Sequence, residues 1–244
     1  MSQIKVVSYN IRHAQGMDGT IHIQRIAASL AHTKAQLIGL QEVDKHMPRS
    51  HFIHQAKTLG QLLNMHWVYG PNLDWGVAQY GNAILSYWPV LLYRQYMLPS
   101  KGEQRGLLEA VLQLKHSKVS FFCTHLGLNQ EERAAQVKEI LNIIKKCCYP
   151  CILVGDFNDG PTSKEHRLLT TILKDAVGIQ GSIKTFPSHK PQEQIDYIFV
   201  SPEWKILSAS TYTTLASDHL PVQITLVLTL EDEEVYKNIH LTKK

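Results

Sequence analysis

The sequence predicts a single α/β domain in which mixed β-sheets are covered by helices. Short apolar runs of strand length alternate along the chain with segments whose apolar residues recur at helical spacing. Several strand-length runs follow one another with only a turn between them, which indicates hairpins and therefore sheets that are not purely parallel. The 244 residues can bury a sizeable core, and no repeat or linker divides them. We expect the domain to span residues 1–230, followed by a solvated tail at residues 231–244.

The first half of the chain carries four expected strands and two expected helices. An apolar run at residues 4–10 ends in Asn10 and predicts the first strand. Ile23, Ile26 and Leu30 lie on one face of a helix. The remaining expectations are a strand at residues 37–40, a helix ending near residue 64, strands at 66–69 and 83–87, and an exposed aromatic loop at 74–81.

The second half begins with a predicted hairpin. Residues 90–97 and 107–114 are expected to be antiparallel neighbours joined by a turn at 99–106. Asn129 and Glu132 form a capping-box pattern at the start of a long helix. The other expected elements are strands at 119–123 and 152–154, a helix at 163–175, and strands at 195–200, 206–213 and 220–230.

Charge and hydropathy disfavour a dedicated nucleic-acid binder, a membrane-spanning protein and a secreted protein. The formal net charge of +4 suits anionic substrates, but no dense basic stripe identifies a nucleic-acid binder. No apolar run reaches eighteen residues, so we expect no transmembrane segment. The start of the chain lacks the apolar segment and cleavage site of a signal peptide, and we expect a cytoplasmic protein.

Two of the four cysteines, Cys148 and Cys151, form a C-x-x-C pattern that leaves redox and zinc interpretations open. Thioredoxin-type motifs follow a strand and open a helix, whereas here a helix ends and a strand begins. A zinc site would need a second ligand pair, and none is evident at a matching spacing. We therefore expect reduced thiols, and the sequence assigns no role to Cys147, Cys148 or Cys151.

Polar residues gather where the expected strands begin and end. Those at strand exits are Asn10, Glu42, His125 and Asp156, and those at strand entrances are Asp196, Asp218 and His219. In a mixed sheet, the exit of one strand and the entrance of its antiparallel neighbour share an edge. We therefore expect these side chains to meet at one rim. Asp156 and Asn158 have a competing interpretation, because such residues after a strand often close an Asx turn.

The composition of this rim indicates a divalent cation. Four carboxylates in one cleft repel one another unless a positive charge lies between them, and Mg²⁺ prefers carboxylate and amide oxygens. Two histidines beside such a site suit acid–base chemistry or contact with an anion. The chain has no G-x-S-x-G elbow, Walker-type loop, G-x-G-x-x-G or H-E-x-x-H, so serine hydrolases, nucleotide kinases, dehydrogenases and zincins are disfavoured.

An ordered set of short motifs resembles the endonuclease/exonuclease/phosphatase superfamily, the DNase I-like hydrolases. The motifs cover nearly the whole chain and are Ser8-Tyr-Asn10, Gln41-Glu42, Gly81-Asn82, Thr124-His125, Gly155-Asp-Phe-Asn158, Ile195-Asp-Tyr197 and Ser217-Asp-His219. Each motif is weak alone, but the ordered set is specific. The resemblance implies a four-layer α/β sandwich of two mixed sheets flanked by helices, and Mg²⁺-dependent hydrolysis of phosphoesters.

The resemblance also implies roles for individual residues. Asp156 matches the residue that orients or deprotonates the attacking water, and Asn158 the one that holds a phosphate oxygen. His219 matches the phosphate-binding histidine, with Asp196 as its orienting partner. The full implied set is Asp156, Asn158, His219, Asp196 and His125 as catalytic residues, Glu42, Asn10 and Asp218 as metal ligands, and Arg105 and Asn82 at the substrate.

Three of these assignments keep alternatives, and two positions depart from the family pattern. Asn10 either lies at the metal or is a strand-end cap. Arg105 either reaches the phosphate or is a salt-bridging turn residue, and Asn82 either contacts substrate or braces the cleft. Gln194 and Tyr87 stand where many compact bacterial members have a basic residue. We expect both replacements to remove positive charge from the rim, which disfavours a bulky polyanionic substrate.

The functional prediction is a Mg²⁺-dependent phosphoester hydrolase, with Mn²⁺ as a possible substitute. A phosphodiesterase that uses in-line attack of water on phosphorus is favoured. The alternatives are a nuclease acting on DNA or RNA and a catalytically silent phosphate-binding module. The substrate is an ester of a lipid head group, an inositol phosphate or a nucleic acid, and the sequence does not choose among them.

Overall fold

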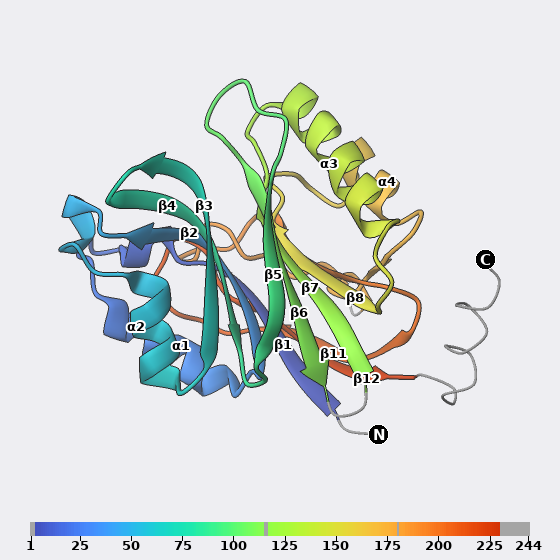
Figure 1. Cartoon of the computed structure of the whole chain (residues 1–244), viewed down its shortest axis with the longest axis horizontal. Coiled ribbons are helices and arrows are strands. Elements are labelled where there is room, and N and C mark those ends of the chain that lie inside the picture. Colours follow the sequence, from blue (N-terminus) through green and yellow to red (C-terminus); the bar gives the residue numbers. More distant parts are fainter. Residues whose placement is uncertain (1–2, 115–116, 180, 230–244) are drawn as a thin grey trace.

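The computed structural model describes residues 3–114, 117–179 and 181–229, which form a sandwich of four layers (Figure 1). Two six-stranded sheets pack face to face in the middle. Helices α1 (Ile23–Thr33) and α2 (Gln55–Leu63) cover the outer face of one sheet, and α3 (Gln130–Ile144) and α4 (Lys164–Leu169) that of the other. The predicted α/β sandwich of two mixed sheets is therefore confirmed.

The first sheet has a parallel pair at its centre. Its strands in spatial order are β11 (Trp204–Thr211), β12 (Val222–Leu228), β1 (Gln3–Asn10), β2 (Leu37–Lys45), β4 (Ala78–Ser86) and β3 (His66–Trp75). Strands β1 and β2 run parallel, and their other neighbours run antiparallel to them. The carboxyl ends of β1 and β2 therefore lie at the same edge.

The second sheet repeats this arrangement. Its strands in spatial order are β5 (Val90–Met97), β6 (Gly106–Leu114), β7 (Ser117–His125), β8 (Cys151–Asp156), β10 (Asp196–Val200) and β9 (Lys174–Asp175). Strands β7 and β8 are the parallel pair, and β10 runs antiparallel to β8. Loops at the carboxyl ends of central parallel strands are the usual location of sites in α/β sheets.

Three apolar clusters hold the four layers together, one at each interface. Leu37 and Val154 belong to the cluster between the sheets, Ile26 to the one under α1 and α2, and Ile140 to the one under α3 and α4. The sheets approach closely at Gly39 of β2, where a Cβ would collide with Cγ2 of Val154. A glycine is therefore required at this point of the core.

The start of α3 confirms half of the predicted capping box. The Asn129 side chain accepts a hydrogen bond from the backbone N–H of Glu131 at 2.8 Å, which satisfies a helix-end donor. The carboxylate of Glu132 does not reach back to Asn129. It accepts from the backbone N–H of Gly102 at 2.7 Å and from that of Lys101, so it ties the 99–105 loop to the helix.

Two local predictions were wrong. The expected loop at 74–81 is a continuous hairpin of β3 and β4 in which Trp75 pairs with Ala78, and the turn needs the positive φ of Gly76. The expected helix at 163–175 ends at Leu169, because Asp175 pairs with Phe199 as part of the sheet. The predicted tail at 231–244 lies outside the described residues.

The described residues bear on the membrane and cysteine expectations. In the described part of the chain, no helix has the length and apolar character needed to span a membrane. The four cysteines are free thiols, and Cys148 is exposed while Cys151 is buried in β8. Burial raises the pKa of the Cys151 thiol to about 12, so this thiol is protonated at neutral pH.

Candidate active site

The strand registers bring the predicted residues from both sheets to one edge. In the second sheet, His125 at the end of β7 pairs with Asp156 at the end of β8, and Asp156 pairs with Asp196 at the start of β10. In the first sheet, Asn10 at the end of β1 pairs with Gln41. The amide of Asn10 then crosses to the second sheet, where its Nδ2 lies 3.0 Å from Oδ2 of Asp156. The predicted convergence is thus a feature of the fold.

Glu42 is aimed at Asn10 by an irregularity in β2. The pairing of β2 with β4 shifts register between Leu40 and Val43, and Glu42 has a φ of 57°. Such bulges re-aim side chains and are common beside active sites. Oε1 of Glu42 accepts a hydrogen bond of 3.0 Å from Nδ2 of Asn10. The Asn10 amide nitrogen therefore bridges the carboxylates of Glu42 and Asp156.

Asp156 is the centre of the polar network. Its Oδ1 accepts from the backbone N–H of Asn158 at 3.0 Å, so the Asx turn is present. Its Oδ2 faces Asn10 and lies 3.5 Å from Nε2 of His125 and 3.6 Å from Nε2 of His219. Asp156 can therefore close the Asx turn through Oδ1 and still take part in the site through Oδ2. Burial, opposed by the nearby His219, raises the pKa of Asp156 to about 7.

His219 is held by a buried carboxylate. Its Nδ1 lies 2.9 Å from Oδ2 of Asp196, which is fully buried and also accepts a hydrogen bond from the hydroxyl of Thr185. Burial alone would lower the pKa of His219, but the carboxylates of Asp196 and Asp156 outweigh it and raise this pKa to about 10. His219 is therefore a cation at neutral pH, with Nε2 directed towards Asp156.

His125 is a neutral imidazole, unlike the cationic His219, although its Nε2 lies 3.5 Å from the same carboxylate of Asp156. Burial and the positive charges of Arg105 and His219 hold the pKa of His125 well below its usual range. Its Nδ1 lies 3.2 Å from Nη1 of Arg105, and its Nε2 lies 3.0 Å from Nδ2 of Asn158. Both neighbours are N–H donors, which disfavours a doubly protonated ring. The site thus contains one neutral and one cationic imidazole.

Arg105 makes the salt bridge expected of a turn residue, and it also contacts His125, which neither interpretation of Arg105 predicted. It forms a 2.7 Å ion pair with Glu103, as a turn arginine would. Its side chain is nevertheless buried, and its Nη1 contacts Nδ1 of His125.

Asn82 braces the junction of the two sheets. It is fully buried in β4 and donates a hydrogen bond of 3.2 Å to the carbonyl of Gly106, which also accepts from the hydroxyl of Thr124. Its contacts support the bracing interpretation.

Asp218 lies beside an unusual turn that sequence reasoning missed. Arg12, His13 and Ala14 all have positive φ, between 43° and 67°. Non-glycine residues rarely adopt this conformation, and such strain concentrates at functional sites. Nε of Arg12 lies 3.4 Å from Oδ2 of Asp218, so the turn brings a cation to the carboxylate side of the site. The sequence Asn10-Ile-Arg-His has no glycine that could have signalled it.

Thr185 is the second missed residue. It lies eleven positions before Asp196 in a segment without regular secondary structure, and only the fold brings its hydroxyl to the carboxylate.

The oxygen-donor set fits a hard divalent cation on the Glu42 side. Ligand atoms of Asp156, Asp196 and His219 lie within 4.8 Å of one another, but a protonated imidazole cannot coordinate a metal. Glu42 and Asp218 are partly exposed carboxylates, as Mg²⁺ ligands that share the ion with water and substrate should be. The residues that could hold the ion are therefore Glu42 and Asp218, next to Asn10.

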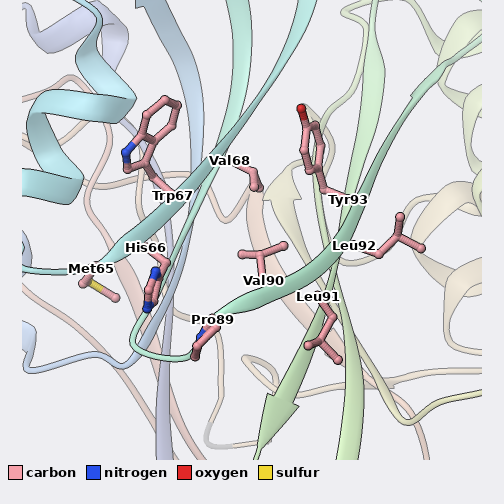
Figure 2. Close-up of a pocket in the computed structure, with 9 residues that line it drawn as sticks. All are labelled: Met65, His66, Trp67, Val68, Pro89, Val90, Leu91, Leu92 and Tyr93. Carbon is pink, nitrogen blue, oxygen red and sulfur yellow. The ribbon is translucent and has the colours of Figure 1, made fainter.

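Among the cavities lined by described residues, two differ in their relation to the predicted site. One of about 640 Å³ lies between β3 and β5 and is lined by Trp67, Val68 and Val90 among others (Figure 2). It contains no predicted site residue. Tyr87 belongs to that end of the sheet, because neighbouring Ser86 pairs with Leu37, far along β2 from Glu42. The prediction that Tyr87 lies at the rim was wrong. A second cavity of about 340 Å³ borders Asn158.

Known proteins resemble this chain in sequence or in fold. The profile of the Endonuclease/Exonuclease/phosphatase family matches residues 7–219. A protein of Escherichia coli K12, YbhP, described as uncharacterized, is 29% identical over 171 residues, which are 64% of this chain and 66% of that protein.

Two solved structures from Bacteroides thetaiotaomicron share the fold. An endonuclease/exonuclease/phosphatase family protein superposes with a TM-score of 0.79 at 23% identity over 94% of this chain and 99% of its own. A mannosyl-6-phosphatase superposes with a TM-score of 0.77 at 22% identity over 92% of this chain and 100% of its own. Because the family profile spans most of the sequence, this chain belongs to the endonuclease/exonuclease/phosphatase family.

Proposed function

We propose that this protein hydrolyses phosphoesters with the help of a divalent cation, Mg²⁺ or its substitute Mn²⁺. One observation carries the proposal. Asp156, with a pKa near neutrality, lies between a cationic His219 and the Asn10 amide that reaches Glu42. A base, a phosphate-binding cation and metal-binding carboxylates are the groups that water needs to attack phosphorus.

Asp156 is the proposed base. Deprotonated Asp156 accepts a proton from the attacking water, and its two oxygens are fixed by Asn10 and by the backbone N–H of Asn158. A pKa close to the working pH is favourable for a general base, because the group is ionised yet still basic enough to take the proton.

His219 and Asn158 are the proposed phosphate-binding groups. The imidazolium of His219 donates to a phosphoryl oxygen and stabilises its developing charge, while Asp196 fixes the ring through Nδ1. The Asn158 amide gives one N–H to the carbonyl of Leu126 at 2.9 Å, and its other N–H, which faces Nε2 of His125 at 3.0 Å, is the proposed second donor to the phosphate. His125, held by Arg105, completes this side of the site.

Glu42 and Asp218, with Asn10 beside them, would hold the cation. When bound, the cation neutralises the negative charge of the phosphate and of the departing oxygen. In the proposed reaction, the water oxygen bonds to phosphorus and the ester P–O bond breaks. Asp156 receives the water proton, and the departing alkoxide takes a proton from solvent to leave as the alcohol.

We propose diesters as the primary substrates and monoesters as the second candidate. Family membership supports phosphoester chemistry in general. The monoester candidate is favoured by one specific likeness, the shared fold with the mannosyl-6-phosphatase of B. thetaiotaomicron.

A substrate panel tests the proposal. It contains bis-p-nitrophenyl phosphate, p-nitrophenyl phosphate, plasmid DNA, single-stranded RNA, sphingomyelin, inositol phosphates and hexose phosphates, assayed with Mg²⁺, with Mn²⁺ and with EDTA. We expect at least one ester to be hydrolysed with metal and not with EDTA, and the rate to fall about 10³-fold in Asp156→Asn. Ser210→Ala, an exposed position on β11, is the matched control. Hydrolysis that resists EDTA, or equal rates in wild type and Asp156→Asn, would contradict the proposal.

A further inference from the structure

A cavity borders Asn158, one of the proposed phosphate-binding residues. It has a volume of about 340 Å³ and is lined by residues 158–161 on one side and residues 192–195, with Ser182 and Lys184, on the other. Asn158 is common to this cavity and to the hydrogen-bond network of His125. A group attached to a phosphate at Asn158 can therefore extend into the cavity.

Gln194 belongs to this wall, and its buried side-chain amide carries an unsatisfied donor. Its side chain is 5% exposed, and its Nε2 has no hydrogen-bond partner among the described residues. The backbone around it is fixed, because its carbonyl accepts from the Tyr197 hydroxyl at 2.9 Å and the carbonyl of Ile195 accepts from Phe157 at 2.8 Å. A buried N–H without a partner is costly, and a ligand oxygen would remove that cost.

The charges of the lining disfavour a second anionic group. Among the described residues that line the cavity, Lys184 is the one positive side chain, and Asp159 and Glu193 are negative. Asp159 is already neutralised by Arg133, at 3.0 Å, which lies outside the lining. A second phosphate in the cavity would therefore be repelled by Glu193, and the exposed ammonium of Lys184 would be the one cation among the described lining residues to offset that repulsion. Hydroxyl groups, which donate and accept, suit this mixture of amide, carboxylate and ammonium.

Gly160 leaves the cavity open. A Cβ at this position would meet no atom within 4 Å, and its φ lies in the range that other residues adopt. The cavity can thus be filled by substitution without disturbing its wall.

We propose that this cavity binds the organic group of the phosphoester substrate, and that this group is an uncharged, hydroxyl-bearing one such as a sugar or glycerol. Gln194 is the specificity-determining residue, because its neutral amide N–H would donate to a polyol hydroxyl, whereas a basic side chain at this position would favour a second phosphate. This inference rests on the proposed function and names the substrate class of the same site.

The experiment compares three esters within the class, mono- or diester, that the substrate panel identifies: a methyl ester, a hexosyl or glyceryl ester, and the same polyol ester carrying a second phosphate. The kcat/KM for each is measured in wild type, Gln194→Arg and Gly160→Phe. The controls are Gln61→Arg on the exposed face of α2 and Ser210→Phe on β11, which add the same charge or ring elsewhere.

We expect wild type to prefer the polyol ester to the doubly phosphorylated ester by at least tenfold. Gln194→Arg should reduce that ratio at least tenfold, and Gly160→Phe should lower kcat/KM for the polyol ester at least tenfold while the methyl ester changes less than twofold. Gly160→Phe decides the matter if Gln194→Arg does not fold, because a Cβ at position 160 meets no atom within 4 Å. Unchanged ratios in folded variants that still cleave the methyl ester would overturn this inference alone. Absence of cleavage of every ester by wild type would instead overturn the proposed function.

Discussion

At the residue scale, the central feature is the buried pair of Asp156 and His219, whose side-chain pKa values both lie above their ordinary values. The pKa of Asp156 is raised to about 7 chiefly by burial, and that of His219 is raised to about 10 by two carboxylates despite burial. Both folded-state pKa values exceed their ordinary values, so each group contributes stability at low pH that is lost as the pH rises through its folded pKa. We therefore expect the unfolding free energy of the metal-free protein to fall from about pH 4 to pH 7 through Asp156, and from about pH 6.5 to pH 10 through His219. Urea unfolding in EDTA measures this, and the Asp156→Asn/His219→Gln double variant, which lacks both groups, should show a smaller fall. An equal fall in both proteins would contradict the assigned charge states.

Asp196 offers a separate test, because it acts through His219. It is fully buried, and its contact with Nδ1 fixes the ring. We expect Asp196→Asn to lower kcat by about 10² with a smaller change in KM, and to lower the pKa of His219. Kinetics and NMR titration of the His219 ring are the two measurements. A reduced kcat with an unchanged ring pKa would indicate a purely structural role.

At the element scale, the bulge of β2 and the close approach of the sheets decide where the site forms. Gly39 lies three residues before Glu42, and a side chain there would push against Val154 of β8, the strand that carries Asp156. We expect Gly39→Ala to destabilise the protein by about 1–3 kcal/mol, as overpacking of a core does. Thermal unfolding measures the loss, and Gly160→Ala, whose Cβ meets no atom within 4 Å, is the control. Equal melting temperatures for the two variants would refute the claim of close contact.

Helix α3 provides a prediction that is independent of the site. Asn129 caps its first turn through Oδ1. We expect Asn129→Ala to cost about 1 kcal/mol of stability and to leave hydrolysis unchanged. Chemical denaturation checks the first expectation, and the ester assay the second. A loss of activity without a loss of stability would show that the α3 cap influences the site.

The elements also show what the sequence could and could not predict. Strands such as residues 4–10 and helices such as α1 were predictable because their apolar residues recur with a clear period and pack on one face. The helix at 163–175 was overextended, because its last residues satisfy a helical pattern while Asp175 gains more by pairing with β10. The hairpin at 74–81 was missed, because its polar residues resemble a loop and only the partner strand gives them order.

At the scale of the whole molecule, the site exists because two sheets with parallel centres end at the same edge. Asn10 and Glu42 come from one sheet and His125, Asp156 and Asp196 from the other, and the Asn10 amide joins the two sets. Motif order along the chain predicted these residues. Arg12 and Thr185 escaped prediction, because the first depends on a left-handed turn and the second on a contact between distant segments.

The central claim is that this edge binds a cation and a phosphate side by side. Crystals of the wild type grown with Mn²⁺ and inorganic phosphate test it most directly, through the anomalous signal of manganese. We predict an anomalous peak at the carboxylate of Glu42, with phosphate in contact with His219 and Asn158, and loss of the peak in Glu42→Gln. A manganese peak away from Glu42, or phosphate bound without contact to His219, would contradict the account.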